Sequence, residues 1–230
     1  MSDAGFPSAS PPPRVTPVDE VEKLLTGTHE RIKADRGPLA WLRCRPTSQR
    51  FAFVLLTLAA LLAVIPWRFQ RPDFSTYPPL RMALTFSAYL FALALSIREL
   101  VRPLYTARGR VEVFVLATAA LPLLLATLPP AYRTENLSTV GHGHDCIAVG
   151  MLAGFLAMLV VRAVDRAPRV GTGQALLLGS SAGLFANLVL LLHCPIDRPS
   201  HLLVTHAFLG VALAALFRVI GPSAPRPLPM

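Results

Sequence analysis

The sequence predicts an all-α membrane protein: a bundle of six transmembrane helices preceded by a short cytoplasmic amphipathic helix. Of its 230 residues, 53% are hydrophobic and only 15% are charged, whereas a soluble domain carries about 25% charged residues. Six apolar runs contain no charged residue, and each is 16 to 19 residues long, near the lower end of the roughly 17–25 residues that cross a bilayer. The runs are 51–67, 82–97, 113–128, 146–161, 174–192 and 201–217.

The positions of the basic residues predict the orientation of this bundle. Loops rich in Lys and Arg stay on the cytoplasmic side, and 17 of the 22 basic residues fall on one set of alternating loops. We therefore expect a multi-pass protein of the bacterial inner membrane with both termini in the cytoplasm. The formal net charge of +9 then reflects topology, and no direct nucleic-acid binding is predicted.

The chain divides into a cytoplasmic segment 1–50, a membrane domain 51–217 and a cytoplasmic tail 218–230. Residues 1–14 are rich in proline and are expected to be disordered. The first apolar run begins after about 50 polar residues, which is typical of a retained span and not of a cleaved signal peptide.

An amphipathic helix is predicted over residues 17–36. Thr16 is a suitable N-cap and Pro17 suits the first helical position; acidic residues lead and basic residues follow, as the helix dipole favours. The apolar face of such a helix lies on the membrane surface, packs on the loops or binds another protein. Its acidic start favours partner binding, because membrane-surface helices carry Lys and Arg along their polar face. The apolar stripe comprises Val18, Val21, Leu24, Leu25 and Ile32.

The six runs lack the charged groups that mark ion and substrate pathways, so a transporter is disfavoured. Arg98, Glu99 and Asp165 follow the predicted helix ends, where we expect them to be solvated. Two pairs of glycines at four-residue spacing allow helix backbones to approach closely. These pairs are Gly150 with Gly154 and Gly179 with Gly183.

Two cysteines, Cys146 and Cys194, fall at the outer ends of the fourth and fifth spans. A structural disulfide, a Cys/His metal site and a reversible dithiol switch are all compatible with this placement, as are two inert thiols. His142, His144 and His193 stand close by in sequence and are the candidate metal ligands, although the spacing matches no standard zinc pattern. No cofactor is predicted.

Several segments resemble one known family. They are the amphipathic segment 19–25, Cys146 opening the fourth span, the glycine-containing run 182–184, the turn 192–195 with Cys194, and the following residues 197–199. Over residues 17–220 the chain is similar to the six-span, zinc-free membrane anti-sigma factors of proteobacteria and myxobacteria, some of which act in the light-induced carotenoid response.

This resemblance implies that the N-terminal region sequesters an extracytoplasmic-function sigma factor. An envelope, redox or light-derived signal would then release the sigma factor. The Gly-His-Gly-His run 141–144 has no place in the family pattern, which leaves a metal or haem role open for it. The segment 18–41 is also shorter than the helical domain of zinc-containing anti-sigma factors and lacks their ligands, which implies a different docking mode.

A membrane enzyme is the alternative, either a thiol:quinone oxidoreductase or a haem- or metal-binding enzyme that uses the outer Cys and His residues. Such an enzyme would show turnover, a chromophore or a bound metal. Thiol-exchange enzymes tend to use a reactive Cys-x-x-Cys pair, and the chain has none. We therefore predict a regulatory binding protein, not an enzyme.

Overall fold

The computed structural model describes residues 22, 39–68, 75, 77–102, 111–127, 139–165, 172–196 and 198–220. The chain forms two units, residues 1–41 and 42–230. The predicted amphipathic helix over residues 17–36 and its apolar stripe lie outside the described residues, apart from the helical Glu22. The predicted disordered segment 1–14 lies outside them too. The bundle described below belongs to the second unit.

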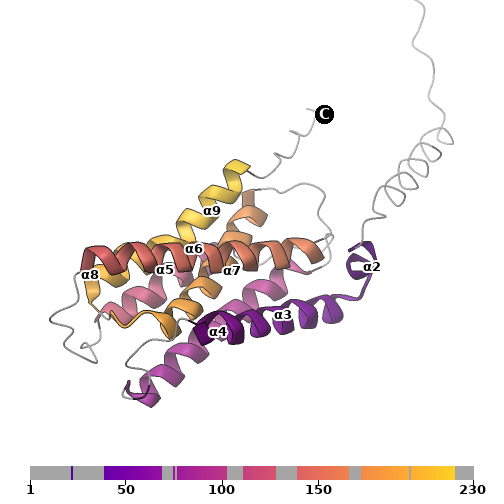
Figure 1. The fold of residues 1–230 in the computed structure, drawn as a ribbon. Coiled ribbons are helices and arrows are strands. Elements are labelled where there is room, and N and C mark those ends of the chain that lie inside the picture. Colours follow the sequence, from indigo (N-terminus) through magenta and orange to yellow (C-terminus); the bar gives the residue numbers. More distant parts are fainter. Residues whose placement is uncertain are drawn as a thin grey trace, which may run out of the picture. The chain divides into compact units, whose positions relative to one another are not determined.

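Within the described parts of the chain, all regular structure is helical (Figure 1). Each of the six predicted apolar runs forms a helix, and the last run is built from three consecutive helical pieces. The elements are α2 (Ala40–Arg43), α3 (Thr47–Arg68), α4 (Pro79–Leu100), α5 (Val111–Thr127), α6 (Thr139–Val164), α7 (Thr172–His193), α8 (Pro199–His201), the π-helix η1 (Leu202–Ala207) and α9 (Phe208–Ile220).

Four of these helices, α3, α4, α6 and α7, are long and apolar enough to cross a membrane. This agrees with a membrane protein. The apolar helix α5 has 17 residues and is therefore about 25 Å long at 1.5 Å per residue, short of the roughly 30 Å hydrocarbon core. The segment Pro199–Leu213 is also apolar but shorter than the four, so six crossings stay a prediction.

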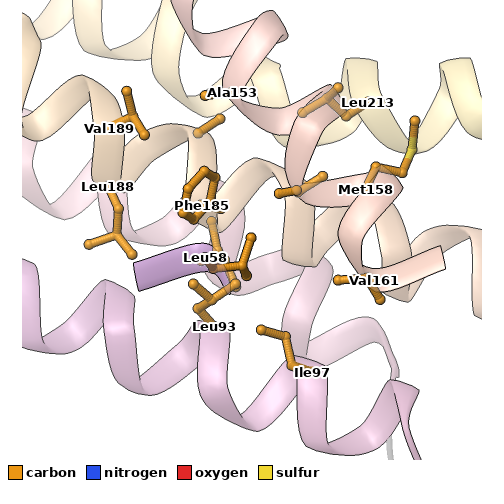
Figure 2. Packing of buried hydrophobic residues seen from close by; sticks show 14 of the residues in the cluster. Leu58, Leu93, Ile97, Ala153, Met158, Val161, Phe185, Leu188, Val189 and Leu213 are labelled. Atoms are coloured by element: carbon orange, nitrogen blue, oxygen red, sulfur yellow. The ribbon is translucent and has the colours of Figure 1, made fainter. Parts of the chain in front are cut away.

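Helix α7 is the centre of the bundle. Along its apolar stretch 89% of the residues are buried, because α3, α4, α5, α6 and α9 all pack against it. Figure 2 shows Phe185 and Leu188 of α7 in the same buried cluster as Leu58 of α3 and Leu93 of α4. The other helices are therefore arranged around α7 and not around a shared central space.

Small residues allow one helix, α9, to approach both α6 and α7 closely. A Cβ on Gly183 of α7 would clash with the Cα of Gly210 in α9, and one on Gly154 of α6 would clash with the side chain of Leu213 in α9. The predicted close approach at Gly150, Gly154 and Gly183 is confirmed, and each of these three glycines contacts α9. In a bilayer such close packing is a main source of helix association.

The expectation that Asp165 is solvated was wrong. Its side chain is buried, pairs with Arg162 at 3.1 Å and accepts a hydrogen bond from Gln174 Nε2. The physical reason is that Gln174, in the first turn of α7, donates to the Asp165 carboxylate, and the dipole at the start of α7 favours an anion there. Arg98, by contrast, is exposed.

Replacing Gly183 by alanine is expected to destabilise the bundle by about 1–3 kcal/mol, because the new Cβ meets backbone atoms that cannot rotate away. Gly173→Ala in the same helix is the matched control, since an added Cβ there has no described neighbour within 4 Å. Thermal unfolding of both purified variants in detergent measures the difference. Equal melting temperatures would contradict the close contact of α7 with α9.

Candidate functional site

The structure brings Cys146 and Cys194 together. Helices α6 and α7 pack along each other and are joined by a short connection, so the start of α6 and the end of α7 lie at one end of the bundle, which we call the cysteine end. The two sulfur atoms are 3.1 Å apart. Both side chains are buried, and both are free thiols.

A third side chain, His201, joins the two thiols. Its Nε2 atom lies 3.1 Å from Cys194 Sγ, and the ring is buried. The chain turns sharply after α7, and Pro199 begins α8 at the first helical position, where the fixed φ of proline suits a helix start. The sequence placed His201 near the cysteines but gave no spacing pattern that marks it as a member of the site.

His206 reaches the same cluster because η1 is π-helical. In an α-helix, residues five apart point about 140° away from each other, at 100° per residue. A π-helix bonds residue i to residue i+5, so His201 and His206 lie on one side and contact each other edge to face, with ring centroids 5.5 Å apart. Single π-helical turns often occur at functional sites.

Opposing influences act on the pKa of Cys194, which directly follows the apolar stretch of α7, and their net effect raises it. Its hydrogen bond with Cys146, followed by burial, raises the pKa of this thiol. The contact with His201 at 3.1 Å and the neighbouring His206 lower this pKa, but less than the first two influences raise it.

A small polar cavity of about 20 Å³ adjoins Cys194. Within the described part of the chain, three buried atoms on its walls have no hydrogen-bond partner: Tyr89 OH, Asn187 Oδ1 and His206 Nε2. A volume above about 10–15 Å³ with two to four polar partners is what a single buried water requires. The cavity beside the cluster thus has the space and the polar partners for about one water molecule.

Two of the three histidines that sequence proximity favoured as metal ligands are not part of the cysteine cluster. His144 is exposed and His193 is half-buried, and neither belongs to the cluster of Cys146, Cys194 and His201. The side chain of His142 lies outside the described residues.

At the opposite end of α6, two arginines bind the last backbone carbonyls of two helices; we call this the arginine end. The buried Arg50 donates from Nη2 to the Val101 carbonyl at 2.7 Å and from Nη1 to the Val164 carbonyl at 3.3 Å. Arg43 Nε donates to the Ala163 carbonyl at 3.2 Å. The last carbonyls of a helix have no partner within it and form the negative end of its dipole, so arginine suits both places.

Treatment of the purified, reduced protein with a thiol oxidant such as diamide is expected to join Cys146 to Cys194 within one chain. The sulfur atoms have to move from 3.1 Å to about 2.05 Å, which is a small change. Peptide mapping by mass spectrometry under non-reducing conditions detects the link.

The Cys44→Ser variant serves as the control for this crosslink, because Cys44 is exposed and is not part of the cluster. It should form the link as the unmodified chain does. A disulfide that involves Cys44, or no intramolecular disulfide at all, would contradict the arrangement of the cysteine end.

Two thiols and two imidazoles at these distances can form a disulfide, exchange a proton or bind a thiophilic cation. Disulfide formation and cation binding would each fasten α6 to the end of α7. Comparisons of the chain with protein-family models, with curated proteins and with solved structures find no match.

Proposed function

We propose that this protein is a membrane-bound anti-sigma factor. In this proposal, the cytoplasmic segment with the helix 17–36 holds an extracytoplasmic-function sigma factor inactive at the inner membrane. The chemical state of the cysteine end then controls the affinity of this segment for the sigma factor. Six crossings with both termini in the cytoplasm, which the distribution of basic residues favours, place the cysteine end on the outer side.

The observation that carries this proposal is that one helix, α6, connects the two ends of the bundle. Cys146 lies near its start, and the carbonyls of Ala163 and Val164 lie at its end. At 1.5 Å per residue the distance from Cys146 to Ala163 is about 26 Å. Arg43 and Arg50, which bind those carbonyls, directly follow the proposed sigma-binding segment in the chain.

A change at the cysteine end therefore has a physical route to the arginine end. Disulfide formation shortens the separation of the two sulfur atoms by about 1 Å and shifts α6 against α7. The arginine hydrogen bonds depend on distance and angle, so a shift of α6 along its axis alters them. A signal changes binding only as far as its two states differ in free energy, and these hydrogen bonds supply such a difference.

The small cavity beside Cys194 weighs against one form of the enzyme alternative, a thiol:quinone oxidoreductase with its quinone bound at this thiol. A quinone ring needs far more space than the roughly 20 Å³ beside Cys194, which suits about one water molecule. A thiol:quinone oxidoreductase would place its quinone next to the reactive thiol. The geometry of the cysteine end is better suited to a sensing role than to electron transfer to a quinone.

The first prediction from this proposal concerns the apolar stripe. The full-length chain should co-purify from detergent-solubilised membranes with an extracytoplasmic-function sigma factor of the same organism. Val21→Asp, Leu25→Asp and Ile32→Asp should abolish co-purification, because a buried unpaired carboxylate strongly disfavours an apolar interface. Sigma-dependent transcription should then become constitutive.

The matched control is Ala34→Asp, which introduces the same charge on the opposite side of the predicted helix, at 100° per residue. This variant should retain the sigma factor. Retention by all three stripe variants, or loss in Ala34→Asp alone, would contradict the proposed interface.

The second prediction concerns Arg50. Replacing Arg50 by methionine removes hydrogen bonds to two helix ends, and each bond from a charged donor is worth about 1.5–3 kcal/mol. We expect a chain that still reaches the membrane but whose sigma-dependent reporter no longer responds to an oxidant. The matched control is Arg98→Met in the last turn of α4, where the side chain is exposed. An unchanged response in Arg50→Met would show that the arginine end does not transmit the signal.

A further inference from the structure

The cysteine end carries the ligand set of a metal site. Cys146 Sγ, Cys194 Sγ and a ring nitrogen of His201 all lie within 4.8 Å of one another, and all three side chains are buried. Among the described residues this is the one group of three or more potential ligands so arranged. The geometry points to a binding site for a single Zn²⁺ ion, held by Cys146, Cys194 and His201, with His206 as the candidate fourth ligand.

The distances fit a cation better than they fit a disulfide. Tetrahedral zinc binds thiolate sulfur at about 2.3 Å, which places two ligating sulfur atoms about 3.7 Å apart. The observed separation of 3.1 Å needs to open by about 0.6 Å for zinc, whereas a disulfide requires it to close by about 1 Å. The separation of 3.1 Å between Cys194 Sγ and His201 Nε2 similarly needs to widen only slightly.

Tetrahedral zinc needs a fourth ligand, and His206 is the candidate. Its ring centroid lies 5.5 Å from that of His201, and its buried Nε2 has no hydrogen-bond partner among the described residues. Its ring nitrogens lie outside the group of three ligands, so His206 would have to move toward the ion. The π-helical turn, which is a costly departure from α-helical geometry, is what brings the two imidazoles to one side. A site with two cysteines and two histidines is a common closed site for structural zinc.

Backbone contacts around the two histidines hold their segment in place. Thr205 Oγ1 donates to the His201 carbonyl at 2.6 Å, and Asn187 Nδ2 donates to the His206 carbonyl at 3.3 Å. The second bond ties η1 to α7. Groups that fix the position of ligating residues in this way raise metal affinity.

Charge balance selects zinc among the cations that prefer sulfur and imidazole. Two thiolates and two neutral imidazoles around Zn²⁺ give a net charge of zero, which matters because an uncompensated buried charge is strongly disfavoured. The same ligands around Cu⁺ leave one negative charge. Magnesium and calcium prefer oxygen ligands, and the cluster offers none.

Zinc binding is tested on the full-length chain purified in detergent under reducing conditions. After incubation with zinc chloride and removal of free metal by gel filtration, zinc and protein are quantified by elemental mass spectrometry. We expect one zinc ion per chain. Cys194→Ser and His201→Ala should lower the zinc affinity at least about tenfold, the smallest effect typical even for groups that merely support a ligand.

Two variants provide matched controls. Cys44→Ser and His144→Ala replace exposed residues of the same types and should keep one zinc ion per chain. Circular dichroism shows whether each variant is folded. Loading with Co²⁺ adds a second measurement, since thiolate ligands give a charge-transfer absorption that should weaken in Cys194→Ser and persist in both controls.

Three results would overturn the assignment: no stoichiometric zinc in the unmodified chain, equal zinc affinity in Cys194→Ser, or binding of Cu⁺ without Zn²⁺. Zinc binding requires no sigma factor, and it is measured on the chain alone. Its failure is therefore distinguishable from failure of the proposed regulatory function, which the co-purification experiment tests.

Discussion

The burial of helix α7 on all sides is the constraint on which the rest of the structure depends. Five helices contact it, and small residues such as Gly183 set how closely they approach. In a lipid environment this packing, and not exclusion of water, is what holds helices together. Gln174 at the start of α7 contacts Asp165 at the end of α6, and Cys194 after the end of α7 contacts Cys146 near the start of α6. The position of α7 therefore determines both ends of the bundle.

The two ends contain the polar chemistry that the apolar middle lacks. At the cysteine end, two thiols and two imidazoles are packed into a buried cluster. At the arginine end, Arg50 joins the last turns of α4 and α6. Helix α6 runs between them, so an event that fastens Cys146 to Cys194 acts on the same rigid element that Arg43 and Arg50 hold. In the proposed function, this connection carries the state of the cysteine end to the arginine end.

Hydrophobic patterning predicted the helical class and the placement of all six apolar helices, because long uncharged runs admit few alternatives. The positions of Cys146 and Cys194 at equivalent span ends allowed them to be neighbours, but their contact depends on the packing of α6 against α7, which the sequence did not establish. His201 and His206 could not be recognised in the same way, since their convergence depends on a π-helical turn that five-residue spacing does not reveal. The burial of Asp165 was missed because it depends on a tertiary contact with Gln174 of α7. Sequence proximity instead favoured His144, which is exposed.

The central claim is that the chemical state of the cysteine end changes the structure of the arginine end. Cys44 offers the most direct test of this claim. This exposed thiol lies between Arg43 and Arg45, beside the contact with the end of α6. Its alkylation rate can be followed by mass spectrometry of its own peptide, in the reduced chain and after Cys146 and Cys194 are crosslinked. The account predicts that the crosslink changes the rate several-fold. An identical rate in the two states would contradict it.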